Sequence, residues 1–290
     1  MTAAASVARL AVLLEAGLTP LDAWRHLGET EEAAARIAET DGPERLPDAI
    51  LAATREHPDA VGWACVAAAW RIAADSGAPL AATLARLADV LVAADDARRE
   101  VEIALAGPLA TRRIVLALPV LGLLGGMLMG VDTLGVLVTT PLGWFCLFAG
   151  GVLLVVGRRW MSRLVDRARV VDPAPGLAAE LVAIAVAGGG SPEPALDRAA
   201  AALEAAGLPP DDSPAEVVGF ARRAGVPLAT LLRAEARETR RDAQAAVRIR
   251  IAALGTRLLL PLGACVLPAF VALAVAPLLL AMIRDTFAGF

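Results

Sequence analysis

Three long segments without a charged residue constrain this chain more than any other feature. They are Ile114–Val131, Leu134–Gly157 and Leu258–Ile283. A membrane-spanning helix needs roughly 20 consecutive apolar residues to cross about 30 Å of hydrocarbon, and each segment is close to that length. The chain has 290 residues, of which 57% are hydrophobic, and its mean hydropathy is +0.62. We therefore predict an integral membrane protein with three transmembrane helices.

Arginines lie on the outer sides of the first two segments, and only Asp132 and Thr133 lie between them. The flanking arginines are Arg98, Arg99, Arg112 and Arg113 on one side and Arg158, Arg159, Arg163, Arg167 and Arg169 on the other. Positive charge next to a span favours the cytoplasmic side, so this pattern predicts a hairpin with both ends in the cytoplasm. Several arginines precede the third segment and only Arg284 follows it. We expect a multi-pass protein of the cell membrane with a cytoplasmic N-terminus and an external C-terminus.

The rest of the sequence has the periodicity of helices and no β pattern, which predicts an all-α fold. Thr19-Pro20 and Ser191-Pro192 both have the form of a helix start, with a capping residue followed by proline. Asp59–Asp75 is amphipathic, and its apolar residues are expected on one side of the helix. These residues are Val61, Cys65, Val66, Ala69 and Ile72.

Two parts of the sequence match each other, which favours an internal duplication. Gly77-Ala78-Pro79-Leu80-Ala81 is repeated 148 positions later as Gly225-Val226-Pro227-Leu228-Ala229. We interpret Gly77 and Pro79, and likewise Gly225 and Pro227, as the turn that ends one helix and begins a long one. The two copies would be repeated cytoplasmic helical bundles, each of which leads into a membrane span.

The predicted organisation follows from this duplication. If both bundles lie on one side of the membrane, an additional span must return the chain between them. In order, the segments are a first cytoplasmic helical domain (1–112), transmembrane helix 1 (113–131), a return helix (134–157), a shorter second cytoplasmic domain (158–257), transmembrane helix 3 (258–283) and a short non-cytoplasmic tail (284–290).

No pattern in the sequence indicates catalysis, a metal or a cofactor. There is no phosphate-binding loop with a lysine, and no nucleophile or zinc motif. His26 and His57 are the only histidines, and two are too few for a metal site of their own. Cys65, Cys146 and Cys265 are expected to be small buried side chains. The net charge of −4 argues against nucleic acid as a partner. We expect a protein that is not an enzyme.

Glycines recur every four residues in the first span, at Gly122, Gly126 and Gly130. Such a stripe allows another helix to approach closely. The partner helix could belong to this chain's own three-helix bundle or to a second copy in an oligomer. Prolines inside the spans remove backbone donors and are expected to bend their helices. These are Pro119, Pro261, Pro268 and Pro277.

Arginines are concentrated on the segments that lead into the spans. They include Arg98, Arg99, Arg237, Arg240 and Arg241. One interpretation is a solvated helix surface that faces anionic lipid headgroups. The alternative is a face on which a cytoplasmic partner docks.

Two motifs accompany this layout of domains and spans. The opening Glu15-Ala16-Gly17-Leu18-Thr19-Pro20 has a counterpart in Gly189-Gly190-Ser191-Pro192. The second motif is Ala74-Asp75-Ser76-Gly77-Ala78-Pro79-Leu80. In both motifs and in layout the chain resembles the type II secretion system F family, and most of all its short members from Tad-type (Flp) pilus systems. The second motif of that family commonly contains a glutamate, which this chain lacks, and Asp75 is the nearest substitute.

This resemblance implies an inner-membrane platform protein without enzymatic activity. Its partners would be a cytoplasmic secretion or pilus ATPase, pilin subunits, the lipid bilayer and a homologous platform protein or a second copy of itself. Two other functions stay open from the residues alone: a subunit of a membrane permease and a membrane-anchored adaptor unrelated to secretion. A solute path would need a polar lining, which the spans lack.

Overall fold

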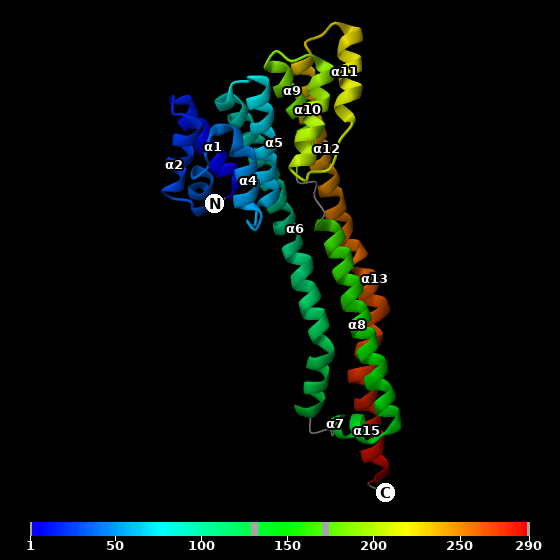
Figure 1. Cartoon of the computed structure of the whole chain (residues 1–290). Helices are drawn as coiled ribbons and strands as arrows, with labels where there is room; N and C mark the ends of the chain where they lie inside the picture. The colour runs from blue at the N-terminus through cyan, green and yellow to red at the C-terminus, as the bar shows by residue number, and fades with distance from the viewer. Residues whose placement is uncertain (1, 129–132, 170–173, 289–290) are drawn as a thin grey trace. The chain divides into compact units, whose positions relative to one another are not determined.

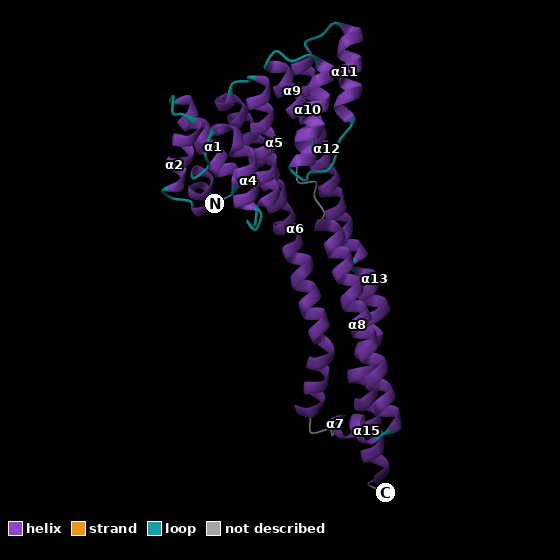
Figure 2. Cartoon of the chain, viewed as in Figure 1, coloured by secondary structure: helices purple, strands orange, loops and turns teal. Residues whose placement is uncertain are grey.

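The structure is a computed structural model that describes residues 2–128, 133–169 and 174–288. Every regular element in these ranges is helical (Figure 2), which confirms the all-α prediction. By internal contacts the chain divides into two compact units. The first comprises Met1–Arg98 and Asp172–Ala245, and the second comprises Arg99–Val171 and Ala246–Phe290.

The first unit draws helices from both halves of the chain (Figure 1). The first half supplies α1 (Ala3–Glu15), α2 (Pro20–Gly28), α3 (Glu32–Ala38), the 3₁₀ turn η1 (Pro43–Arg45), α4 (Leu46–Thr54), α5 (Ala60–Ser76) and the start of α6 (Leu80–Leu128). The second half supplies α9 (Leu177–Ala187), α10 (Pro192–Ala205), α11 (Ser213–Ala224) and the start of α12 (Leu228–Arg257). Parts of both predicted cytoplasmic domains therefore share one compact unit. Whether the two parts arose by duplication stays a prediction.

The predicted start of α2 is confirmed in its details. Thr19 is the N-cap residue, and its Oγ1 accepts a hydrogen bond of 3.3 Å from the backbone amide of Asp22. Pro20 occupies the first turn, where its missing N–H group costs nothing. Ser191 likewise occupies the N-cap position of α10, although its side chain makes no capping hydrogen bond.

Helix α5 is the centre of the first unit, and the prediction that only one of its sides is buried was wrong. All residues from Gly62 to Trp70 are buried, whereas Val61 is 39% exposed. The reason is that α5 packs against α1 and α4 from the first half and against α9 and α10 from the second half (Figure 1). The periodicity of a helix does not show whether a distant part of the chain covers its second face.

Three tryptophans form the largest aromatic cluster described in this core. The ring of Trp24, from α2, lies 6.0 Å from that of Trp63 and 5.8 Å from that of Trp70, both from α5. All three side chains are almost fully buried. Aromatic rings at such distances stabilise a core beyond the area that they bury.

The second unit contains the predicted spans. It comprises the remainder of α6, α7 (Thr133–Thr139), α8 (Pro141–Arg169), the end of α12, α13 (Leu259–Pro261), η2 (Leu262–Val266), α14 (Leu267–Phe270), η3 (Val271–Val275) and α15 (Ala276–Ala288). Helix α8 packs along α13, α14 and α15, and α7 packs against α8 and α15 (Figure 1).

Residues 134–157, the predicted return helix, contain a break in the helix, and the boundaries of this span in the membrane stay a prediction. The chain breaks at Thr140 between α7 and α8, and α8 continues to Arg169. Pro141 cannot donate to a carbonyl in the preceding turn and disfavours helical backbone at Thr140. The Thr140 hydroxyl accepts the Gly143 amide at 3.0 Å, and the Trp144 indole donates to the Val138 carbonyl at 2.9 Å. These bonds satisfy backbone and side-chain groups that an apolar environment would leave without partners.

The third predicted span contains two π-helical turns, η2 and η3. Each includes the residue four positions before a proline: Ala264 before Pro268 and Leu273 before Pro277. Proline has no N–H group to donate to that carbonyl, and its ring would collide with it, so the backbone widens at this point. The expectation that prolines distort this span is confirmed at these two positions.

Two helices in the described residues are long and apolar enough to cross a membrane. They are Pro141–Arg167 and Leu228–Leu280, and the second is a run of consecutive helical elements from α12 into α15. The first predicted span, 113–131, lies in α6 up to Leu128, and its last residues lie outside the described residues. Three spans therefore stay a prediction, whereas a membrane protein with apolar spans is supported by length and composition.

Candidate functional site

The structure describes the neighbours of one of the three glycines in the predicted stripe, Gly122. A Cβ atom at position 122 would lie 2.7 Å from the Ala274 Cβ and 2.9 Å from the Phe270 Cε2. Gly122 thus allows α6 to approach the third span of the same chain. Gly126 is described only as helical backbone, and Gly130 lies outside the described residues. The contact at Gly122 favours packing within the chain at this position.

Replacing Gly122 with leucine is expected to destabilise the second unit by about 1–3 kcal/mol, because the side chain would overlap two residues of the facing helix. Gly125 is the matched control, since nothing lies within 4 Å of a Cβ at that position. Thermal unfolding in detergent should show a lower Tm for Gly122→Leu and an unchanged or higher Tm for Gly125→Leu. Equal Tm values for the two variants would contradict the proposed packing.

The two copies of the predicted turn motif have the same backbone geometry. Gly77 follows α5 with φ +68°, and Gly225 follows α11 with φ +67°. In both turns the glycine amide donates to the carbonyl four residues earlier, which is Ala73 or Ala221. This left-handed conformation favours glycine and ends a helix sharply. Pro79 and Pro227 then directly precede the long helices α6 and α12.

Arg98, one of the five predicted docking arginines, is engaged within the first unit. Its Nη1 lies 3.3 Å from Asp59 Oδ1 and 3.3 Å from Asp95 Oδ1. The other carboxylate oxygen of Asp59 accepts a 2.9 Å hydrogen bond from the Ala3 amide at the start of α1. Arg98 therefore helps to hold α1 against α5 and α6.

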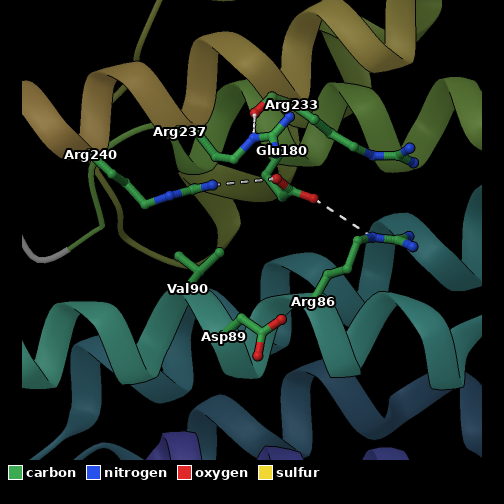
Figure 3. Close-up of a pocket in the computed structure, with 7 residues that line it drawn as sticks. All are labelled: Arg86, Asp89, Val90, Glu180, Arg233, Arg237 and Arg240. Carbon is green, nitrogen blue, oxygen red and sulfur yellow. Dashed lines mark hydrogen bonds and ion pairs between the residues drawn. The ribbon is translucent and has the colours of Figure 1, made fainter.

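The other four predicted arginines divide into two pairs. Arg99 and Arg241 are exposed on their helices. Arg237 and Arg240 instead line a cavity of about 400 Å³ in the first unit (Figure 3). The lining residues come from α6, α9 and α12, and they are Arg86, Asp89, Val90, Glu180, Arg233, Arg237 and Arg240.

Glu180 lies at the centre of this cavity (Figure 3). It is only 4% exposed to solvent. Its Oε1 is 3.8 Å from Arg86 Nε, and its Oε2 is 3.9 Å from Arg240 Nη2. Both distances exceed that of a hydrogen bond. In the described part of the chain, Arg86 Nε, Arg233 Nε, Arg240 Nη1 and Glu180 Oε1 are buried without a hydrogen-bond partner.

The electrostatics of the cavity follow from this burial. Desolvation lowers the pKa of the Arg86 guanidinium, the charge of Arg233 lowers it further, and Glu180 opposes the shift. Desolvation is also the largest cause that lowers the pKa of Arg240, with an opposing effect of Glu180 and a smaller lowering by Arg237. The nearby carboxylate therefore does not fully compensate the buried positive charges.

Arg86, Glu180 and Arg233 were not among the predicted site residues. One signal in the sequence points to Glu180: it is the only charged residue in the apolar segment Leu177–Ala187. A charged side chain is rarely buried unless it is paired, so an isolated acid in such a helix indicates a polar contact across the core. The partners of Glu180 could not be derived from periodicity.

Opposite charges also occur at positions that the predicted duplication makes equivalent. Arg248 lies 148 residues after Glu100 and binds it through two hydrogen bonds, of 2.9 Å and 3.1 Å, within the second unit. Asp89 and Arg237, at the same offset, both line the cavity of the first unit. At this offset, α6 and α12 therefore carry opposite charges at two pairs of positions.

The two histidines and three cysteines lie at helix ends or in buried positions. His57 Nδ1 accepts the Asp59 amide at 3.0 Å at the start of α5, and His26 lies in the last turn of α2. The three cysteines are buried, as expected. Among the described residues, no group of three or more His, Cys, Asp or Glu side chains is arranged to hold a metal ion.

Comparison with known proteins gives one match. Residues 7–129 match the family model described as "Type II secretion system (T2SS), protein F". No protein of curated function and no solved structure is significantly similar to the chain. The resemblance stated from the motifs is confirmed over this stretch, which covers α2 to α6 and most of α1.

Proposed function

Since residues 7–129 form a domain of the type II secretion system F family, we propose that the chain is an inner-membrane platform component of a Tad/Flp-type pilus assembly or type II secretion machine. In this role it couples a cytoplasmic ATPase to the assembly of pilin or the export of protein. The family match carries the proposal, because it indicates a secretion or pilus assembly platform.

The structure supports this role through its long helices. Helix α6 has 49 residues and α12 has 30, and both run from the residue range of the first unit into that of the second. A continuous helix is a stiff connection, so a force applied near its start can reach a predicted span at its end. We infer that the first unit receives the ATPase and that α6 and α12 pass its movement to the spans.

The π turns of the third span support a role for that span in guiding pilin. Such turns interrupt the regular ladder and are frequent at functional sites in helices. Helices interrupted at η2 and η3 bend more readily than regular helices of the same length. We propose that pilin subunits pass along this span, and that the protein acts with a homologous platform protein or a second copy of itself.

The proposal includes the predicted topology. Three spans, a cytoplasmic N-terminus and an external C-terminus would place the first unit beside the cytoplasmic ATPase. The role requires no catalytic group and no cofactor in this chain, since the ATPase supplies the energy. Deletion of the gene should abolish piliation and pilin export, and the intact gene should restore them. Normal piliation after deletion would refute the assignment.

Reversing the charge of an exposed arginine is expected to weaken ATPase binding at least tenfold if that arginine docks the ATPase. Arg99→Glu and Arg241→Glu are the test variants, since both side chains are exposed. Arg45→Glu is the control, because Arg45 is an exposed arginine in η1, outside the predicted docking segments. Pull-down of the ATPase with the full-length protein in detergent measures the effect. Equal recovery with all three variants would exclude docking through these arginines.

A further inference from the structure

The cavity around Glu180 has an excess of positive charge. Four guanidinium groups line it, from Arg86, Arg233, Arg237 and Arg240, and two carboxylates oppose them, from Asp89 and Glu180 (Figure 3). Two positive charges are therefore not balanced by the lining residues. A recess lined by charges of one sign concentrates ions of the opposite sign.

Three guanidinium nitrogens at this cavity lack a hydrogen-bond partner. Arg86 Nε, Arg233 Nε and Arg240 Nη1 are buried and make no hydrogen bond within the described chain. Glu180 is shared between Arg86 and Arg240 at 3.8 Å and 3.9 Å and binds neither closely. Buried positive charge without partners is costly. The side chains of Arg86 and Arg240 are 35% and 14% exposed, so an oxyanion in contact with their accessible parts would offset this charge and stabilise the site.

The size and lining of the cavity narrow the class of ligand. About 400 Å³ exceeds the space that a single small ion needs. Among the described residues of the lining, Val90 is the only apolar side chain, and none carries an aromatic ring on which a base or sugar could stack. Recognition would therefore depend on charge and on the planar, forked geometry of guanidinium, which matches phosphate oxygens.

From these observations we propose that the arginine cavity formed by α6, α9 and α12 binds a phosphorylated anion of low molecular mass. Glu180 lies between Arg86 and Arg240 and competes with the anion for their charge. The shared chemistry is the phosphoryl group, which can belong to a soluble phosphate or to the headgroup of an anionic phospholipid. This inference does not rest on the proposed function, since its test measures ligand binding by the purified protein in the absence of the ATPase.

Calorimetric titration of the full-length protein in neutral detergent, at constant ionic strength, tests the proposal. The two probes are pyrophosphate and a short-chain phosphatidylglycerol below its micellar concentration. We expect saturable binding of one molecule per chain for at least one probe. Binding of pyrophosphate identifies a soluble ligand, and binding of only the lipid identifies a headgroup site. Absence of saturable binding for both probes overturns the proposal.

Three variants tie the binding to this cavity. Arg240→Gln should weaken it at least tenfold, because Arg240 contributes one of the four positive charges of the lining, and Arg241→Gln on the adjacent exposed position should not change it. Glu180→Gln should strengthen binding several-fold, since a competing negative charge is removed, and a purely structural role of Glu180 would not produce this gain. Unchanged affinity in Arg240→Gln would overturn the proposal. If Arg240→Gln does not fold, Arg237→Gln replaces it, because that side chain is exposed at the cavity.

Discussion

Replacing Trp24 with alanine is expected to destabilise the protein by about 3–5 kcal/mol, which is the cost of deleting a fully buried aromatic side chain. Trp24 has no measurable exposure, and its ring contacts those of Trp63 and Trp70. The loss combines the transfer of apolar surface with the cavity that is left beside Trp63 and Trp70. A shift of this size corresponds to a fall in Tm of roughly 6 to 20 °C.

The matched control is Trp160→Ala, because Trp160 is a tryptophan of α8 that is 40% exposed. Thermal unfolding of both variants and of the wild type in the same detergent, followed by circular dichroism at 222 nm, measures the difference. The Tm of the Trp160→Ala control should fall by less than half as much as the Tm of Trp24→Ala. If the two variants lose the same amount, the tryptophan cluster does not stabilise the first unit in the way described.

Replacing Gly176 with alanine is expected to have a second large effect, of roughly 2–6 kcal/mol. Gly176 precedes α9 with φ +73°, a left-handed conformation in which a side chain is strained. In addition, a Cβ atom would lie 2.7 Å from the carbonyl oxygen and 2.8 Å from the Cα of Ala236 in α12. Backbone cannot rotate away as a flexible side chain can, so α9 and α12 would have to separate.

The variant Gly207→Ala distinguishes the cost of the left-handed backbone from the cost of the close approach to Ala236. Gly207 has a similar φ of +68°, but nothing lies within 4 Å of a Cβ at that position. Gly207→Ala should therefore show only the conformational cost, about 1–2 kcal/mol, and the difference between the variants measures the close approach of α9 to α12. Since Glu180 is on α9, Gly176→Ala should also weaken any anion binding in the arginine cavity, whereas Gly207→Ala should not. Equal Tm losses would show that the approach to Ala236 does not matter.

Local features of the fold could be predicted because their causes are local. The cap at Thr19, the left-handed glycines at positions 77 and 225, and the disturbance of helix by proline all depend on a few neighbouring residues. The same holds for the three charge-free segments, since transfer into hydrocarbon depends mainly on composition and length. The Thr140-Pro141 pair accounts for the break between α7 and α8, and the hydrogen bonds of Gly143 and Trp144 stabilise the start of α8.

The candidate site could be predicted only in part. Arg237 and Arg240 were singled out by the density of charge in the segment that leads into the third span, yet they line a cavity together with Arg86 and Glu180. A charged side chain on a helix has the same sequence pattern whether it faces solvent or a buried partner. Only the packing of a helix from the first half against two helices from the second half distinguishes the two environments.

The sequence by itself determined an all-helical chain with apolar spans and the turn motifs that begin its long helices, because backbone propensity, capping and hydrophobicity act over short distances. Its motifs also indicated the family model that residues 7–129 match. The tertiary structure decided that helices from both halves enclose α5 in one compact unit. It also decided that Glu180 meets Arg86 and Arg240. The physical reason is that burial and charge pairing between distant segments depend on which faces meet, and side-chain periodicity records that a face is apolar but not what covers it.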